Sequence, residues 1–334
     1  EEEVNKVTAI WHRKKEDVKE EEYNEFYKYL TNDYNPPLGT LHLSIEGNIN
    51  FKALLFIPEK APMMLFKDAA ESNLHLYSSK IFIQDDCKEL LPDYLMFVKG
   101  VVDTEDLPLN ISREVTQSSP LMAKIKSVIS GKILSLLEEW ADLNKPKYEK
   151  FFKEFSSLFK IGLNSDYSNK DRIIELLRFQ SSLLEKDELT SLKDYVSRMK
   201  EDQKEIYYVM SSHRDLIERN PNLEYFKKRN IEVLYMTDPV DVFTIPYIFE
   251  YDKKPLKSID KADIELEETT TAETSEPMSK DITETLIKLF KEVLGDKVED
   301  VKESKRLVNS AVTLVVGKQG LDPQMEKMMQ LMDK

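Results

Sequence analysis

Hydrophobic side chains recur in the first part of the chain at two spacings, one typical of helices and one typical of strands. Residues 16–31 carry aromatic and aliphatic side chains at the i, i+3, i+4 and i+7 positions of an amphipathic helix. Apolar and polar residues alternate at 41–45 and again at 49–57, with Glu-Gly-Asn between them at 46–48. This pattern predicts a helix followed by a β-hairpin that buries one face.

The residues after this hairpin predict more strands and then two long helices. A strand is expected at 79–84, a short helix at 87–95 and another strand at 96–102. Ser119 followed by Pro120 is a typical helix start, and Pro146 begins a second helix with an aromatic stripe. An aromatic stripe at helical spacing is far more often core than a ligand site, so these two helices are interpreted as a structural connector.

Helices and strands then alternate, which is typical of a second, smaller α/β unit with a parallel sheet. The expected elements are helices at 170–179, 191–200, 212–219 and 221–229, and strands at 205–210 and 231–236. Residues 258–279 are acidic and rich in Thr and Ser without apolar periodicity, so a domain boundary is placed there. Beyond it we expect a helix at 281–294, strands near 298–301 and at 307–316, and a helix at 322–333.

Composition and charge narrow the class of protein. The 334 residues are 41% hydrophobic, which allows real cores, and no apolar run approaches the roughly 20 residues that span a bilayer. The net charge of −14 argues against nucleic acid as a partner, because phosphate backbones are bound by clustered Lys and Arg. The single cysteine, Cys87, excludes a disulfide framework and predicts a reducing, cytoplasmic location. No membrane partner is expected either.

The chain lacks the parts of a self-sufficient enzyme. None of its eight glycines forms a dinucleotide-binding or P-loop motif. The four histidines lie apart in sequence, so no metal site is predicted. His42 is expected on a strand edge and the other three on the surface. Acidic neighbours of Cys87 would raise the pKa of its thiol, so it is not a candidate nucleophile.

The stretch with the most distinctive chemistry is 100–117, GVVDTEDLPLNISREVTQ. The apolar end of a predicted strand is followed by three carboxylates, Asp103, Glu105 and Asp106. Pro108 fixes its own φ and favours extended geometry in the residue before it, so the carboxylates are expected on a turn.

Arg113 and Gln117 follow in the same stretch, four residues apart, so a short helical turn capped by Ser112 would place them on one face. An Arg guanidinium is planar, always charged and suited to phosphate oxygens. Two interpretations stay open from the residues alone: Arg113 contacts a phosphate, or it forms an ion pair with a nearby carboxylate.

The last predicted helix, LDPQMEKMMQLMDK, is rich in methionine. Met325, Met328, Met329 and Met332 crowd one side of it. Flexible, polarisable Met side chains suit a surface that accepts varied apolar partners. The alternative is a helix that packs into a core or a dimer interface.

The order of residues in several long, ungapped motifs resembles the heat-shock protein 90 family of ATP-driven chaperones. The motifs are GVVDTEDLPLNISREVTQ (100–117), IWHRKKEDVKEEEYNEFYKYLTNDY (10–34), FKALLFIPEKAP (51–62), LLRFQSS (176–182) and SLKDYVSRMKEDQKEIYY (191–208). This resemblance covers most of the chain and implies a middle domain with part of a C-terminal domain, nearest the bacterial branch.

The resemblance implies an α/β (α+β) fold: an αβα sandwich, a helical connector, a second smaller α/β unit and a partial α/β C-terminal domain. The expected boundaries are 1–118 for the large α/β part of the middle domain, 119–160 for the connector, 161–260 for the smaller part, 261–279 for an acidic linker and 280–334 for the incomplete C-terminal domain.

The resemblance also implies the function and its residues. In the family, the Arg of the LNxSRE motif and the Gln four residues later reach the ATP site of a separate N-terminal domain, and these positions are Arg113 and Gln117. It implies ATP with Mg²⁺ as the cofactor of the full-length homodimer, with no nucleotide bound by this fragment alone.

Unfolded or partly folded client proteins and the N-terminal ATPase domain are the expected partners. The expected client-binding residues are Tyr34, Phe243, Leu321, Met325, Met328 and Met329; Tyr34 and Phe243 stand where relatives often carry Trp.

Two rival functions belong to other classes. The first is the transducer domain of a type II topoisomerase, which uses a Lys on its loop and handles DNA; Arg113 and the negative charge argue against it. The second is a non-enzymatic interaction scaffold.

Overall fold

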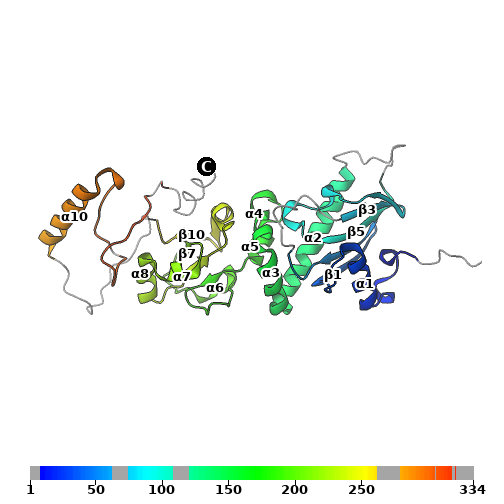
Figure 1. Cartoon of the computed structure of the whole chain (residues 1–334), viewed down its shortest axis with the longest axis horizontal. Helices are drawn as coiled ribbons and strands as arrows, with labels where there is room; N and C mark the ends of the chain where they lie inside the picture. The colour runs from blue at the N-terminus through cyan, green and yellow to red at the C-terminus, as the bar shows by residue number, and fades with distance from the viewer. Residues whose placement is uncertain are drawn as a thin grey trace, which may run out of the picture. The chain divides into compact units, whose positions relative to one another are not determined.

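The computed structural model describes residues 8–61, 74–107, 120–261, 279–304, 306–317 and 320. The chain divides into two compact units, Glu1–Leu177 and Arg178–Lys334, whose elements are labelled in Figure 1. Each unit contains one five-stranded mixed sheet with helices, which confirms the predicted α/β class.

The sheet of the first unit has the strand order β1-β2-β5-β3-β4. Strand β3 runs parallel to β5, and the other neighbouring pairs are antiparallel. The predicted hairpin is confirmed, because β1 and β2 pair from Gly39 opposite Ile57 to Ile45 opposite Phe51. The strands are β1 (Gly39–Ile45), β2 (Phe51–Ile57), β3 (Leu74–Ser78), β4 (Ile81–Gln84) and β5 (Lys99–Thr104).

Three local predictions in this unit differ from the structure. The strand expected at 79–84 begins at Ile81, because Ser79 and Lys80 have φ of 50° and 68° and form the turn after β3, a strand that was not predicted. The short helix expected at 87–95 is two 3₁₀ turns, η3 (Lys88–Leu90) and η4 (Asp93–Leu95), separated at Pro92, which has no N–H to continue a helix. Strand β5 begins at Lys99 instead of 96.

Helices cover both faces of the first sheet, which gives the expected αβα sandwich. On one face, helix α1 (Glu20–Thr31) and the 3₁₀ turn η1 (Ile10–His12) pack against the sheet through a cluster that includes Trp11, Tyr27, Leu54, Phe56 and Val101. A second 3₁₀ turn, η2 (Lys15–Asp17), lies between them in sequence. Figure 1 shows α1 beside β1 and β5.

The other face carries helices α2 (Pro120–Leu143) and α3 (Lys145–Lys160). Trp140 of α2 lies so close to Gly39 of β1 that a Cβ there would approach its ring to 2.3 Å. Helix α3 begins as predicted, because Asn144 accepts a hydrogen bond from the Lys147 N–H and Pro146 occupies the first turn. Two short helices, α4 (Gly162–Ser165) and α5 (Lys170–Leu176), complete the unit.

Gly100 lets β2 and β5 approach closely. Its φ is 149°, and a Cβ built there would lie 2.2 Å from the carbonyl oxygen of Leu54. Only glycine has neither the side chain nor the conformational restriction that would prevent this approach. Gly100 thus allows β5, the strand that carries Asp103 and Thr104, to pair closely with β2.

The sheet of the second unit has the order β6-β8-β7-β10-β9. Its central strands β8, β7 and β10 are parallel, as predicted, but β6 and β9 pair antiparallel at the two edges. The strands are β6 (Gln180–Ser181), β7 (Ile206–Met210), β8 (Leu234–Met236), β9 (Glu250–Tyr251) and β10 (Lys254–Ser258). The helical segments are α6 (Leu192–Arg198), α7 (Arg214–Glu218), η5 (Pro221–Leu223), α8 (Glu224–Lys228), α9 (Asp241–Thr244) and η6 (Ile245–Tyr247).

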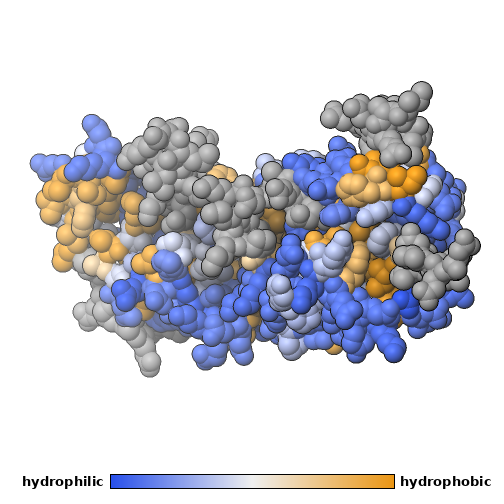
Figure 2. Space-filling model, turned by 45° about the vertical axis from the view of Figure 1, so that its right-hand side comes forward, coloured by the Kyte–Doolittle hydropathy of each residue, from blue (hydrophilic) through white to orange (hydrophobic). Residues whose placement is uncertain are grey.

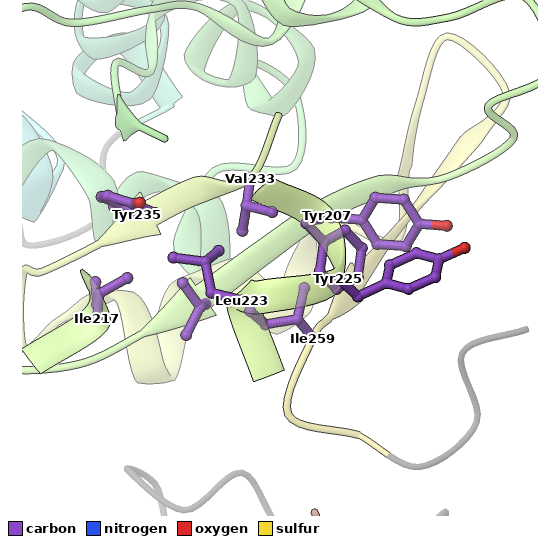
Figure 3. Close-up of a cluster of buried hydrophobic side chains, with 9 residues drawn as sticks. Tyr207, Ile217, Leu223, Tyr225, Val233, Tyr235 and Ile259 are labelled. Atoms are coloured by element: carbon purple, nitrogen blue, oxygen red, sulfur yellow. The ribbon is translucent and has the colours of Figure 1, made fainter. Parts of the chain in front are cut away.

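A cluster of nine buried side chains forms part of the core of this unit. It joins β7 and β8 to α7, η5 and α8, and Ile259 closes it from the end of β10. Figure 3 shows the rings of Tyr207 and Tyr225 pointing the same way at one end of this cluster. The ring of Phe226 packs against both, at centroid distances of 4.8 and 5.4 Å.

The region after the predicted linker differs most from expectation. Helix α10 (Lys280–Leu294) and the 3₁₀ turn η7 (Gly295–Lys297) confirm the predicted helix. The strands predicted near 298–301 and at 307–316 are wrong for the described residues, where only Val316 forms an isolated bridge, with Lys261. Residues 262–278, most of the predicted linker, and the predicted helix at 322–333 lie outside the described residues.

Polar contacts, rather than strand pairing, hold the segment 306–316 on the second unit. The buried guanidinium of Arg306 donates to the carbonyl oxygens of Ile259 and Lys261. Asn222 donates to the carbonyl of Leu314 and accepts from the hydroxyl of Thr313. Within the described part of the chain, no helix is long and apolar enough to span a membrane.

Candidate functional site

The predicted catalytic residues, Arg113 and Gln117, lie outside the described residues, as do Ser112 and Ser119. The same holds for Leu321, Met325, Met328 and Met329. The structure does describe both chain ends that border residues 108–119, namely the end of β5 and the start of α2. It also describes Tyr34 and Phe243.

Asp103 lies near the end of β5 as a buried anchor, and not on a turn as the sequence suggested. Its side chain is 1% exposed. One carboxylate oxygen accepts from Trp11 Nε1 at 3.2 Å and lies 2.7 Å from His12 Nε2. The other accepts from the backbone N–H of Lys80 at 3.2 Å. Groups from two segments far apart in sequence therefore converge on this one strand end.

This arrangement is suited to positioning and not to proton transfer. A buried carboxylate with satisfied hydrogen bonds is stabilised in place, and removing it would leave several donors unpaired. Because Asp103 is buried and already bonded to these donors, it is disfavoured as the ion-pair partner of Arg113. The expectation that His12 lies on the surface is wrong, since its side chain is only 9% exposed and is bonded to Asp103.

Trp11 and His12 are the residues that sequence reasoning missed. The Trp11 ring belongs to a row of aromatic side chains that begins at α1 and reaches β4: Phe26, Trp11, Tyr77 and Phe82, with centroid separations of 5.6, 5.1 and 5.5 Å. Both residues belong to the motif at 10–34, but their contacts with Asp103 span more than ninety residues of sequence. No local pattern could have found it.

Asp106 is tied to the turn between β1 and β2. Its carboxylate accepts from the backbone N–H of Asn50 at 2.6 Å and from Asn50 Nδ2 at 3.2 Å. The Thr104 hydroxyl donates to the Asn50 carbonyl at 2.8 Å, and its oxygen accepts from the Asp106 N–H at 3.2 Å. Leu107, the last described residue before the gap, is buried. The chain therefore leaves β5 in a defined direction.

Tyr34 projects from a hydrogen-bonded segment that follows α1. Asp33, the residue before it, accepts from the hydroxyl of Tyr27 at 3.0 Å and from the backbone N–H of Asn35 at 2.9 Å. The ring of Tyr34 is 80% exposed and faces the ammonium group of Lys28, 4.2 Å from its centroid. Such a pair is amphipathic and accessible to a partner.

Phe243 lies on α9 in the second unit and is 36% exposed. Its neighbours Val242 and Thr244 are buried, so α9 presents Phe243 on its outer side. Tyr247 and Phe249, which follow closely in sequence, are 40% and 75% exposed. Three aromatic side chains within seven residues are thus partly or largely exposed.

Cys87 has the properties of a core residue. It is buried, and burial together with Glu89 and Asp86 raises the pKa of its thiol to about 12. A thiol with such a pKa is protonated at neutral pH and is a poor nucleophile. Among the described residues, no group of three or more His, Cys, Asp or Glu side chains could hold a metal ion.

Comparison with known proteins supports the resemblance seen in the motifs. The chain matches the family model described as Hsp90 protein over residues 1–333. It is 52% identical over 334 residues to the chaperone protein HtpG of Chlorobium luteolum and 53% identical over 332 residues to that of Chlorobium phaeobacteroides. These alignments cover 99% and 98% of this chain and 53% of each relative.

A more distant relative is the chaperone protein HtpG of Geobacter sulfurreducens, which is 41% identical over 338 residues, 100% of this chain and 52% of the relative. The chain thus spans about half the length of the curated relatives it matches.

Proposed function

Because this chain belongs to the Hsp90 protein family, we propose that it is the middle domain and part of the C-terminal domain of an ATP-driven molecular chaperone. The observation that carries the proposal is the alignment of nearly the whole chain with HtpG chaperones at 52–53% identity. On this proposal the full-length protein is a cytoplasmic homodimer. It binds ATP with Mg²⁺ in a separate N-terminal domain and holds unfolded or partly folded client proteins.

Arg113 acts in this proposal as a donor to the γ-phosphate of ATP held by the N-terminal domain, and Gln117 supports it from four residues further on. Charge develops on the phosphate oxygens during transfer, and a preorganised guanidinium lowers the barrier by stabilising that charge. In this proposal the described residues contribute by positioning the segment that carries Arg113. The anchored end of β5 provides a fixed base from which the residues leading to Arg113 begin.

The test is ATP turnover by the full-length protein with Arg113→Ala. Removing one preorganised donor typically costs roughly 10²–10³ in rate, so turnover should fall at least about tenfold while ATP affinity and melting temperature stay nearly unchanged. Arg113→Lys is the matched variant: it keeps the charge but loses the planar fork, so it should recover only part of the rate. Unchanged turnover with a lowered melting temperature would assign Arg113 to a structural ion pair.

The residues of this chain alone should neither bind nor hydrolyse ATP, because their sequence has no phosphate-binding glycine motif. Isothermal titration of this chain with Mg-ATP checks this expectation. Micromolar ATP binding that persists in the Arg113→Ala variant would contradict the proposal that ATP is bound by a separate N-terminal domain.

Client binding is proposed for dispersed apolar side chains. The exposed rings of Tyr34 and Phe243 support a role for these two residues. Met-rich surfaces adapt to varied apolar partners, which supports a role for the third group, Leu321, Met325, Met328 and Met329.

Two pairs of substitutions test this surface. Because their rings are exposed, Tyr34→Ala and Phe243→Ala should change stability by less than about 0.5 kcal/mol and weaken binding of a permanently unfolded test protein. Met325→Ser with Met329→Ser should also weaken binding without a large loss of stability. A loss of roughly 2–5 kcal/mol with unchanged client affinity would instead assign these methionines to a packed core.

A further inference from the structure

The hydrogen bonds that join the β1–β2 turn to the end of β5 lie on the surface of the protein, where they contribute little to core packing. Both Asp106 and Asn50 are exposed, and so is Glu105 beside them. Nevertheless, Asp106 and Asn50 are joined through a backbone N–H at 2.6 Å and a side-chain amide at 3.2 Å. Hydrogen bonds to an ionised carboxylate are short and directional, so they fix geometry even where they add little stability.

Thr104 joins the β1–β2 turn to the end of β5 through buried hydrogen bonds. It is fully buried, and its hydroxyl lies between the carbonyl oxygen of Asn50 and the backbone N–H of Asp106. The turn itself is closed by a bond from the Gly47 N–H to Asn50 Oδ1 at 3.1 Å. Residues 104–106 are therefore held by a turn that lies more than fifty residues earlier in the chain.

We infer that Asp106, held by Asn50 and Thr104, is a positioning residue that sets the direction in which the chain leaves β5 toward Arg113. This inference rests on the proposed function of Arg113. In this inference Asp106 acts through Arg113, seven residues further along the chain, and not by contacting the phosphate itself. Its role is to limit the directions available to the chain, because a misplacement of a catalytic group by about 1 Å can cost a hundredfold in rate.

The experiment is ATP turnover by the full-length protein carrying Asp106→Ala. The matched control is Glu105→Ala, which removes the same charge from the adjacent exposed position. We expect Asp106→Ala to lower kcat by about tenfold with KM for ATP unchanged, since only the placement of a transition-state group is lost. Asp106→Asn keeps an oxygen that accepts the Asn50 N–H, so it should recover most of the rate. Glu105→Ala should resemble the unmodified protein.

A merely structural role for Asp106 predicts a different result. Asp106→Ala would then lower the melting temperature and leave kcat per folded molecule unchanged, and the inference would be overturned. Equal effects of Asp106→Ala and Glu105→Ala would overturn it as well, because the cause would be charge and not geometry. Thr104→Val removes the same junction from its buried side and provides a second variant if Asp106→Ala fails to fold.

The double variant separates this inference from the proposed function. If Asp106 acts through Arg113, adding Asp106→Ala to Arg113→Ala should cause no further loss of turnover. Full additivity of the two losses would show that Asp106 acts elsewhere. If Arg113→Ala alone leaves turnover unchanged, the proposed role of Arg113 fails, whatever Asp106 does.

Discussion

Helices α3 and α10 have similarly amphipathic sequences but opposite surroundings. In α3, the apolar stripe is buried, and Phe155 stacks on Phe97 with ring centroids 4.7 Å apart. In α10, no residue is buried, and Phe290 and Val293 are 38% and 71% exposed. Hydrophobic side chains accordingly show at the surface at the left of Figure 2, the side on which Figure 1 draws α10.

The comparison shows that amphipathic spacing predicts a helix without specifying its partner. Most helical stability in proteins comes from packing of the apolar face. Helix α3 has that packing within its own unit, whereas the described residues supply little of it to α10. The two helices should therefore respond very differently to the same substitution.

The largest expected loss of stability follows the replacement of Phe155. Phe155→Ala should lower the free energy of unfolding of the first unit by about 3–5 kcal/mol, because the ring is fully buried and leaves a cavity. Both tryptophans, Trp11 and Trp140, lie in this unit, so their fluorescence during urea denaturation measures it. The matched variant, Phe290→Ala in α10, should change stability by less than about 0.5 kcal/mol, measured by far-UV circular dichroism. Similar losses for both would contradict the comparison.

A smaller effect is expected at Asp103, the polar anchor of the same unit. Asp103→Ala leaves the buried Nε1–H of Trp11 and the backbone N–H of Lys80 without their acceptor, which should cost about 1–3 kcal/mol. Asp103→Asn keeps one acceptor oxygen and should cost less. Tryptophan fluorescence reports the change directly, because Trp11 is one of the donors. Exposed Glu105→Ala is the control, and an equal loss there would refute the anchoring role.

The smallest expected effect is the acid release of the segment 308–310 from the second unit. Burial raises the pKa of Glu224, but hydrogen bonds from Ser310, Asn309 and Val308 outweigh it and lower that pKa from 4.5 to about 2. Because the folded pKa is depressed, this contact stabilises the docked segment above pH 4.5 and loses its effect as pH falls toward 2.

NMR chemical shifts of the backbone amides of Val308, Asn309 and Ser310 measure this release. Their shifts should change together as the pH falls below 4.5, with a midpoint near 2, and Glu224→Gln should abolish this change. Glu201→Gln, at an exposed position in the same unit, should leave it intact. Amide shifts that stay constant over this window would show that Glu224 does not hold the segment.

Much of the fold could be predicted from the sequence because side-chain periodicity is local. The β1–β2 hairpin and helices α1, α2, α3 and α10 all formed near their predicted ranges. The short strand β3 and the breaks at Ser79, Lys80 and Pro92 were missed, since these elements are too short to show a clear period. The family, too, was evident from ordered motifs, and the comparisons confirmed it.

Only the tertiary structure decided what those elements contact. Asp103 and Asp106 are both carboxylates of one motif, three residues apart, and nothing in their order distinguishes them. The structure buries Asp103 against Trp11 and His12 and leaves Asp106 exposed against Asn50. The same limit explains the segment 306–316, whose alternating residues resemble a strand but which the second unit holds through Arg306, Asn222 and Glu224. Periodicity is set by neighbouring residues, whereas a hydrogen-bond partner many residues away is set by how the whole chain packs.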